Sequence, residues 1–205
     1  MTEDSCQPDV RTRILLEATR LFGERGYDGT SIQAVSEAVG IRRPSLLYHF
    51  KSKEDLRNAG LEQMIAYWKD AIPAILTAAT SGGDRLDRAL TAMVAFFVDD
   101  PNRARLLARE MLDRPDAMSA LFHEHLRPWT GLLTQYIRMG QGAGSIRADL
   151  DPEAWTLAMI TGAIGAVAVG GVSSHMLLDS PDTERQIREL VRIAKSSLFT
   201  PRQEP

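Results

Sequence analysis

The chain has 205 residues, 44% hydrophobic and 25% charged, the composition of an ordinary globular protein of one or two domains. Its one cysteine, Cys6, excludes an intramolecular disulfide and a zinc site built on cysteine pairs. The first nine residues are acidic and lack an apolar segment, so we expect no secretory signal peptide there. The formal net charge of −3 argues against a general nucleic-acid coat protein.

Charge is distributed unevenly along the chain. Residues 1–9 carry a net charge of −3, residues 10–53 carry +4, and residues 54–205 carry −4. The excess of positive charge therefore lies in a short block near the N-terminus. A small basic region joined to a larger acidic one is expected to meet an anionic partner.

Helical periodicity dominates the basic block, and the sequence shows no alternating strand pattern. The first predicted helix covers about residues 10–25 and ends at Gly26. Thr30 then begins a second helix, with Gln33 three residues later in the pattern of a capping box. Gly40 ends the second helix in a short turn.

A third, short helix is predicted over residues 42–50. Leu46 and Phe50 are four residues apart and share its inner face, which leaves a polar outer face. Ser52 and Asp55 form a second capping pair that starts the fourth helix.

A helix, a glycine-containing turn and a short helix with a polar outer face are typical of a helix-turn-helix. Such a short helix fits the major groove of DNA, where its side chains reach base edges and phosphates. Free backbone N–H groups at helix starts can also bind phosphates. The pattern alone also allows a solvated three-helix bundle with capped ends, so both interpretations stay open at this point.

A resemblance to the DNA-binding domain of the TetR family of transcriptional regulators is carried by the segment GERGYDGTSIQAVSEAVGIRRPSLLYHFKSKEDL. It covers about residues 10–57, a quarter of the chain. The shared features are Gly26-Tyr27, Thr30, the Gly40 turn, Tyr48, Phe50, Lys53 and Leu56.

The resemblance implies which residues contact DNA. Thr30 stands where the family contacts a phosphate at the start of the second helix, and Lys53 stands at another phosphate contact. Leu47 departs from the family, which commonly has tyrosine there, and leucine cannot donate a hydrogen bond. The expected DNA contacts are Thr30, Ser31, Arg42, Arg43, Pro44, Ser45, Tyr48, His49 and Lys53.

Amphipathic helices account for the remaining residues, and aromatic and methionine side chains lie on their apolar faces. Such side chains form either a core or the wall of a ligand site. One long helix is expected over residues 116–139, kinked at Pro128, with His125 on its apolar face and His123 on a different face. The candidate ligand contacts are Trp68, Met93, Phe97, His125 and Trp129.

No charged residue occurs in the segment 154–178, which is rich in small residues and poor in leucine and phenylalanine. Small residues recur every fourth position, a pattern that lets another helix approach closely, so we expect burial or an interface rather than a membrane span. The resemblance implies a homodimer formed by the last two long helices. The expected interface residues are Gly162, Ala166, Gly170, Ile187, Leu190, Val191 and Ala194.

These observations predict an all-α protein of about nine helices. Residues 1–9 are expected to be a disordered arm, 10–57 a helix-turn-helix head, 58–199 a helical body for effector binding and dimerisation, and 200–205 a frayed end. The predicted function is that of a cytoplasmic, homodimeric repressor, released from a near-palindromic DNA operator by a small, largely apolar ligand.

Neither an enzyme nor a cofactor or metal site is expected, because no catalytic triad, metal-ligand spacing or glycine-rich phosphate loop is recognisable. The alternatives are a constitutive architectural DNA-binding protein without an effector and, less favoured, an enzyme housed in the helical body. A small membrane protein built on segment 154–178 is a further alternative.

Overall fold

The computed structural model describes residues 9–78 and 82–200. Within these ranges the chain forms eleven α-helices and one 3-10 helix, with an isolated β-bridge between Ile146 and Phe199. The predicted all-α class is confirmed. The arm expected over residues 1–9 and the frayed end expected over residues 200–205 lie mostly outside the described ranges, which leave out residues 1–8 and 201–205.

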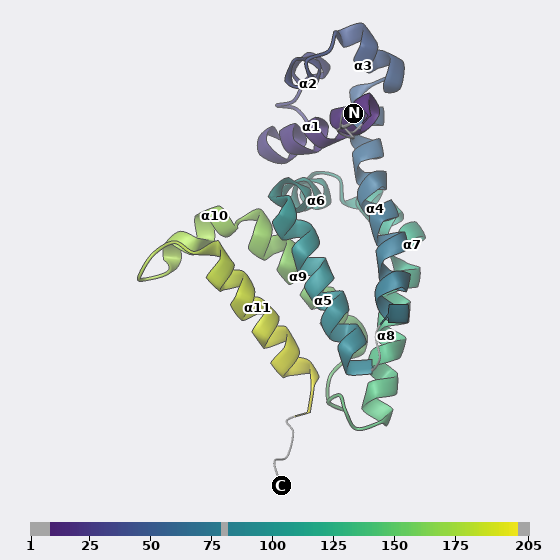
Figure 1. Cartoon of the computed structure of the whole chain (residues 1–205), viewed down its shortest axis with the longest axis vertical. Coiled ribbons are helices and arrows are strands. Elements are labelled where there is room, and N and C mark those ends of the chain that lie inside the picture. Colours follow the sequence, from purple (N-terminus) through teal and green to yellow (C-terminus); the bar gives the residue numbers. More distant parts are fainter. Residues whose placement is uncertain (1–8, 79–81, 201–205) are drawn as a thin grey trace, which may run out of the picture.

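The head consists of α1 (Val10–Arg25), α2 (Ile32–Val39) and α3 (Arg43–His49), which lie together at one end of the long axis of the molecule (Figure 1). Asp9 caps α1, since its carboxylate accepts a hydrogen bond from the backbone N–H of Thr12 at 2.6 Å. Asp9 therefore belongs to the first helix rather than to the expected arm.

Three helices follow the head in the chain, and the first of them, α4 (Lys53–Ala78), connects it to the body (Figure 1). The longest of the three, α4 continues through Pro73 and runs from the head along the length of the body (Figure 1). It is followed by α5 (Gly82–Asp99) and α6 (Pro101–Asp113), and proline occupies the first position of α6, where a missing N–H costs no helical hydrogen bond. The expected boundary after residue 57 falls inside α4, so head and body share this helix.

The long helix expected over residues 116–139 is in fact two helices, α7 (Pro115–His125) and α8 (Arg127–Gly142). Pro128 lies in the first turn of α8. Proline has no N–H to donate, and its ring clashes with the carbonyl four residues earlier, so the chain breaks at Leu126 instead of bending gently. The expectation of one kinked helix was therefore wrong.

The uncharged segment is also broken, into α9 (Pro152–Ala168), α10 (Gly170–Ser173) and the 3-10 helix η1 (Ser174–Met176). Within the described residues no single helix is long and apolar enough to cross a membrane. Only α9 and the α10–η1 segment taken together reach that length and hydropathy, with a bend of 66° between them. The last helix is α11 (Thr183–Leu198).

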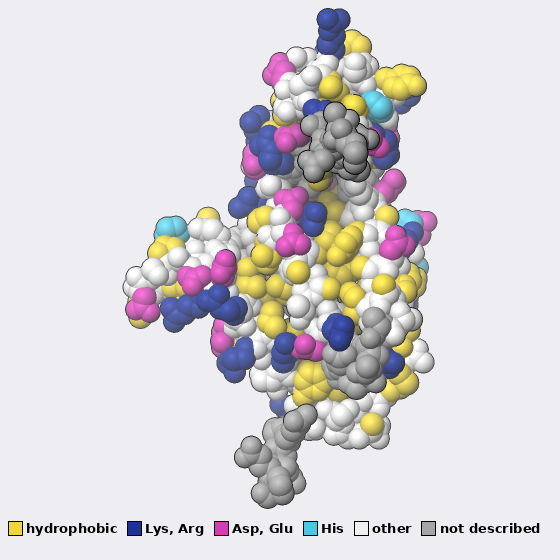
Figure 2. All heavy atoms as spheres, in the orientation of Figure 1, with side chains coloured by type: hydrophobic (Ala, Val, Ile, Leu, Met, Phe, Trp, Pro, Cys, Tyr) yellow, Lys and Arg dark blue, Asp and Glu magenta, His cyan; other side chains and the backbone are white. Residues whose placement is uncertain are grey.

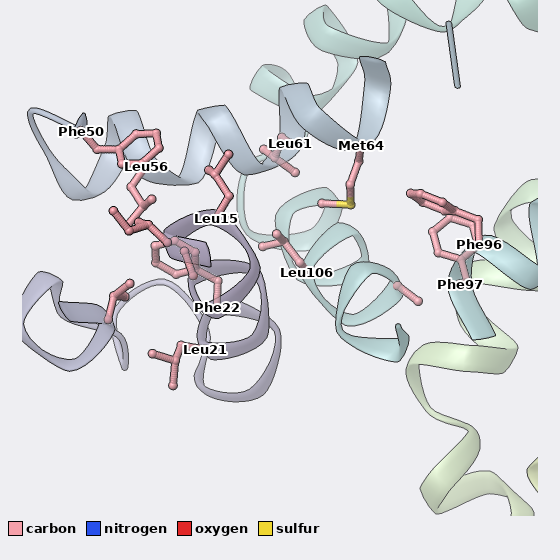
Figure 3. Close-up of a cluster of buried hydrophobic side chains, with 14 of the residues drawn as sticks. Leu15, Leu21, Phe22, Phe50, Leu56, Leu61, Met64, Phe96, Phe97 and Leu106 are labelled. Carbon is pink, nitrogen blue, oxygen red and sulfur yellow. The ribbon is translucent and has the colours of Figure 1, made fainter. Parts of the chain in front are cut away.

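One buried hydrophobic cluster connects the head to the body. It contains residues of α1 to α7 and of α9. In Figure 3, Leu106 of α6 lies between head residues such as Phe22 and body residues such as Met64 and Phe97. Head and body therefore share one packed core.

Candidate nucleic-acid interface and body cavity

The turn between α2 and α3 depends on Gly40. Its backbone is left-handed, with φ 76° and ψ 33°, which residues with a Cβ adopt only with strain. The N–H groups of Gly40 and Ile41 close the end of α2 by donating to the carbonyls of Glu37 and Ser36. The predicted helix-turn-helix is thus formed, and the left-handed backbone of Gly40 ends α2 before the turn that leads into α3.

Ser31, not Thr30, caps α2. The Ser31 hydroxyl accepts from the N–H of Ala34 at 3.0 Å. Thr30 is only 2% exposed, and its hydroxyl donates to the carbonyls of Leu21 and Gly26. The predicted cap at Thr30 was wrong, and a buried, bonded hydroxyl cannot reach a phosphate. The exposed hydroxyl at the start of α2 is that of Ser31.

The outer face of α3 is exposed as its polar pattern predicted. Leu46 is fully buried and Leu47 is half-buried, whereas Ser45 and Tyr48 project into solvent and the Tyr48 side chain is 77% exposed. The ring of His49 meets that of Tyr48 edge-on, with 5.4 Å between the ring centroids. This arrangement leaves a short helix with one packed face and one free polar face.

Cations gather at the start of α3. Arg42, Arg43 and Pro44 are all exposed. Within residues 9–78 and 82–200 no carboxylate forms an ion pair with Arg42 or Arg43, so both guanidinium groups keep their donors for another partner.

Two lysines extend this basic surface beyond α3. The Lys53 ammonium lies 4.1 Å from the centroid of the Tyr27 ring, a cation–π contact that holds it at the start of α4. Lys51 is exposed, and its ammonium lies 5.9 Å from the Tyr48 ring. Sequence reasoning missed Lys51, although its charge and its place directly after the third helix could have identified it.

Close contacts between α1 and α6 fix the head to the body. The side chain of Arg109 donates from Nε to the carbonyl of Gly23 at 3.1 Å and from Nη2 to the carbonyl of Glu24 at 3.4 Å. A Cβ at Gly23 would lie 2.8 Å from the backbone oxygen of Asn102, so only glycine permits this approach. The sequence analysis did not identify this contact, which joins residues 86 positions apart.

A buried charged pair lies at the same junction. Arg57 of α4 and Glu110 of α6 are 2% and 4% exposed, and Nε of Arg57 is 3.6 Å from a carboxylate oxygen of Glu110. That distance is too long for a hydrogen bond, and the Arg57 Nε has no other partner. Burial, with the nearby charge of Asp113 adding, raises the pKa of Glu110 to about 7. The junction therefore contains a carboxyl group that titrates near neutral pH.

A cavity of about 410 Å³ lies in the body between α4, α5, α6, α7, α8 and α9. This volume falls in the usual range for small-molecule sites, and its wall is almost wholly apolar. Four of the five candidate ligand contacts, Trp68, Met93, Phe97 and Trp129, line it.

The fifth candidate, His125, does not line the cavity, whereas His123 does. The break at Leu126 ends α7 at His125, so the helical spacing from Leu121 to Trp129 does not continue across it. The His125 ring instead lies 3.7 Å from the neighbouring carboxylate of Glu124. The prediction that His125 shares the apolar face with Trp129 was therefore wrong.

Several expected interface residues pack within the subunit instead. Ala194 is fully buried, and Gly170 is buried against Thr183 of α11. A Cβ at Gly162 would meet the Leu190 side chain at 3.7 Å, an ordinary contact between α9 and α11. The small-residue pattern therefore mediates a helix contact inside this chain, and Ala194 and Gly170 cannot contact a partner.

The other expected interface residues, Ala166, Ile187 and Val191, are half-buried. Large apolar side chains are exposed on the same two helices at positions the sequence reasoning did not select. They are Leu157 of α9 and Ile193 of α11, 62% and 47% exposed.

Among residues 9–78 and 82–200 no group of three or more metal-ligating side chains comes together.

Two family models match the chain. Residues 14–59 match the model described as bacterial regulatory proteins of the tetR family, and residues 105–191 match a tetracyclin repressor-like C-terminal domain. Together they cover the head and much of the body.

Curated relatives and a solved structure agree with these models. The chain is 30% identical over 163 residues to the HTH-type transcriptional regulator LmrA of Bacillus subtilis, covering 76% of this chain and 85% of LmrA. It is 27% identical over 118 residues to the biofilm operon regulator IcaR of Staphylococcus epidermidis, covering 58% of this chain and only 62% of IcaR. The ketosteroid transcriptional regulator KstR2 of Mycobacterium tuberculosis superposes with a TM-score of 0.75 at 18% identity, over 95% of this chain and 97% of that one, which shows a shared fold.

Proposed function

The chain belongs to the TetR family of bacterial regulatory proteins, and we propose that it is a homodimeric repressor that leaves its operator when a small, largely apolar molecule binds in the body. The observation that carries the DNA-binding part is the exposed start of α3, where Arg42 and Arg43 have no acidic partner among the described residues. In a dimer, two such helices would enter successive major grooves, about 34–36 Å apart, of a near-palindromic site. Because its target is DNA, we expect the protein to act in the cytoplasm.

Each proposed contact has its own task. Arg42, Arg43 and Ser45 face base edges or phosphates from the start of α3, and Tyr48 reaches the backbone from the same face. Ser31 and Lys53 bind phosphates at the starts of α2 and α4. His49 supports the Tyr48 ring, and Pro44 starts the helix. The half-buried Leu47 contributes packing rather than a hydrogen bond.

Two helices support coupling between the cavity and the head. The α4 helix begins with Lys53 on the DNA-binding side and lines the cavity further along with Met64 and Trp68. The α6 helix lines the cavity with Met111 and holds the end of α1 through Arg109. A ligand that favours one packing of these helices over another would change the spacing of the two heads. The free energy that couples ligand binding to DNA binding is typically about 1–3 kcal/mol.

Dimerisation is proposed through the outer faces of α9 and α11, where Leu157 and Ile193 are exposed. Hydrophobic side chains gather over the middle of the body on the face shown in Figure 2. Replacing Ile193 with glutamate should give a monomer in sedimentation experiments, because a partner would bury this charge, and Ile193 does not line the body cavity. The control is Leu112→Glu, at a leucine of α6 that is 82% exposed. An Ile193→Glu variant that is still dimeric would place the interface elsewhere.

Selection of binding sites from a random duplex library tests the regulatory function itself. We expect an enriched inverted repeat whose half-sites are one helical turn apart or a multiple of it. Binding that is salt-sensitive but shows no sequence preference would instead favour an architectural protein. The body cavity favours a ligand-responsive regulator over an architectural protein. An architectural protein needs no ligand site, so a body without a cavity would serve it equally well.

A further inference from the structure

The wall of the body cavity carries a single type of charge. Among the described residues that line it, the one charged side chain is Arg127, and no aspartate or glutamate is present. The other polar side chains are those of His123 and three threonines, Thr130, Thr156 and Thr161. A cavity with one cation and no acid discriminates between ligands by the sign of their charge.

The threonine hydroxyls are already used by the helices that carry them. Thr156 donates to the carbonyl of Pro152 at 2.8 Å, and Thr161 donates to that of Leu157 at 2.9 Å. Thr130 donates to the carbonyl of Arg127 at 3.1 Å. None of these three hydroxyl protons is therefore free for a ligand.

Arg127, in contrast, keeps most of its donors. One of its terminal nitrogens lies 2.7 Å from Nε2 of His123. Because a guanidinium only donates, Nε2 of His123 is the acceptor of this hydrogen bond. Within the described parts of the chain no carboxylate pairs with Arg127, so the His123 contact positions the guanidinium without neutralising its charge.

The remainder of the wall suits a hydrocarbon body. Trp68, Met93 and Phe97 come from α4 and α5, and Ile164 comes from α9. Arg127 stands at the start of α8, next to Trp129. A ligand that fills the cavity therefore meets one charged side chain of the wall, the exposed Arg127, and that side chain is cationic.

We propose that the effector is an amphipathic anion, with its apolar body in the cavity and a carboxylate-type head group bound by Arg127. This proposal rests on the ligand-responsive function above and specifies its ligand class. A guanidinium binds a carboxylate through two parallel hydrogen bonds, which fixes the orientation of the ligand as well as adding affinity.

Intrinsic tryptophan fluorescence provides the readout, because all three tryptophans of the chain, Trp68, Trp129 and Trp155, line the cavity. The probes are dodecanoate, methyl dodecanoate and dodecylammonium, which share one chain and differ in the charge of the head group. We expect the full-length protein to bind dodecanoate about ten-fold more tightly than the ester, the factor typical of a charge-assisted hydrogen bond, and dodecylammonium most weakly.

Arg127→Gln should abolish the preference for the acid and leave affinity for the ester unchanged. The matched control is Arg138→Gln on the same helix, because Arg138 pairs with Glu153 at 2.8 Å and does not line the cavity. Thermal unfolding of both variants checks that they fold, and Arg127→Lys should retain part of the preference.

Three results separate this inference from the proposed function. Equal affinity for acid and ester in the native chain, or a preference that survives in Arg127→Gln, overturns the anionic head group but leaves an apolar effector possible. Binding of none of the probes overturns the ligand class. Binding that depends on Arg127 but leaves operator affinity unchanged supports the site and contradicts the release of the repressor from DNA.

Discussion

The arginines at the start of α3 and those along α11 are all exposed but lie in different electrostatic surroundings. Arg42 and Arg43 have no carboxylate partner in the described chain, whereas Arg188 pairs with Asp182 and Glu184, and Arg192 pairs with Glu189. Along the edge of the body formed by α10 and α11, basic and acidic side chains lie side by side (Figure 2). A nucleic-acid surface is therefore indicated by unpaired cations and not by the number of arginines.

Removing the unpaired arginines should have the largest effect. The double variant Arg42→Ala, Arg43→Ala should weaken operator binding by about 1–3 kcal/mol for each residue that contacts a base, and should lose discrimination at those positions. The matched control on α11 is Arg188→Ala. Fluorescence anisotropy with operator and random duplexes checks both, and an equal loss in the control would remove the distinction between the two helices.

A third charge environment, the buried pair of Arg57 and Glu110, should affect stability rather than DNA binding. Since burial raises the pKa of Glu110 from 4.5 to about 7, the folded chain binds this proton more tightly than the unfolded chain. Stability should then fall as the pH rises through this interval and level off above it. Glu110→Gln removes the titration, so at pH 8 the variant should be more stable than the native chain by about 1–3 kcal/mol.

Denaturant unfolding at a series of pH values measures this difference, with the exposed Glu62→Gln as control. The stability gained by Glu110→Gln should disappear as the pH falls below 4.5, where the native carboxyl becomes protonated in both the folded and the unfolded state. A variant less stable than the native chain at pH 8 would mean that attraction to Arg57 outweighs the cost of burial.

Lysines allow the same comparison with a smaller effect. Lys53→Ala should lower affinity for all DNA sequences and reduce the slope of log affinity against log salt by about one, as expected for one lost phosphate contact. Lys195 of α11 pairs with Asp87 at 2.6 Å, so Lys195→Ala should leave the slope unchanged. If both variants have the native slope, Lys53 is not a phosphate contact.

The smallest effect is expected on α11 itself. Hydrogen bonds from Arg192 lower the pKa of Glu189, yet both groups are exposed, so the pair contributes little to stability. Arg192→Ala should lower the free energy of unfolding only slightly, because solvent screens an exposed ion pair. A double-mutant cycle with Glu189→Ala, measured by denaturant unfolding, isolates the pair, and a large coupling energy would indicate that its charges do stabilise α11.

The head could be predicted closely because its signals are local. The Gly40 turn, the buried Leu46 and the cap formed by Ser52 and Asp55 each depend on residues a few positions apart, and all are present in the structure. The error at Thr30 shows the limit of such signals. Two adjacent hydroxyls both fit a cap, and only tertiary burial decides which one performs it.

The body was harder to predict because its important contacts join distant segments. Nothing near Arg109 in the sequence indicates that it reaches Gly23, and nothing near Glu110 indicates burial beside Arg57. Apolar spacing did indicate most of the cavity wall, since helical periodicity identifies the inward face without saying whether that face is packed or hollow. His125 was misplaced because a break in the helix changes the register after it.

Hydrogen exchange of the full-length protein, with and without a selected operator, tests the central claim most directly. It asks which part of the chain the DNA covers, and dimer contacts present in both samples cancel from the difference. We predict that operator slows exchange in residues 31–53, where the unpaired cations lie, and leaves α11 unchanged. Protection of α11 with no change in residues 31–53 would contradict the account.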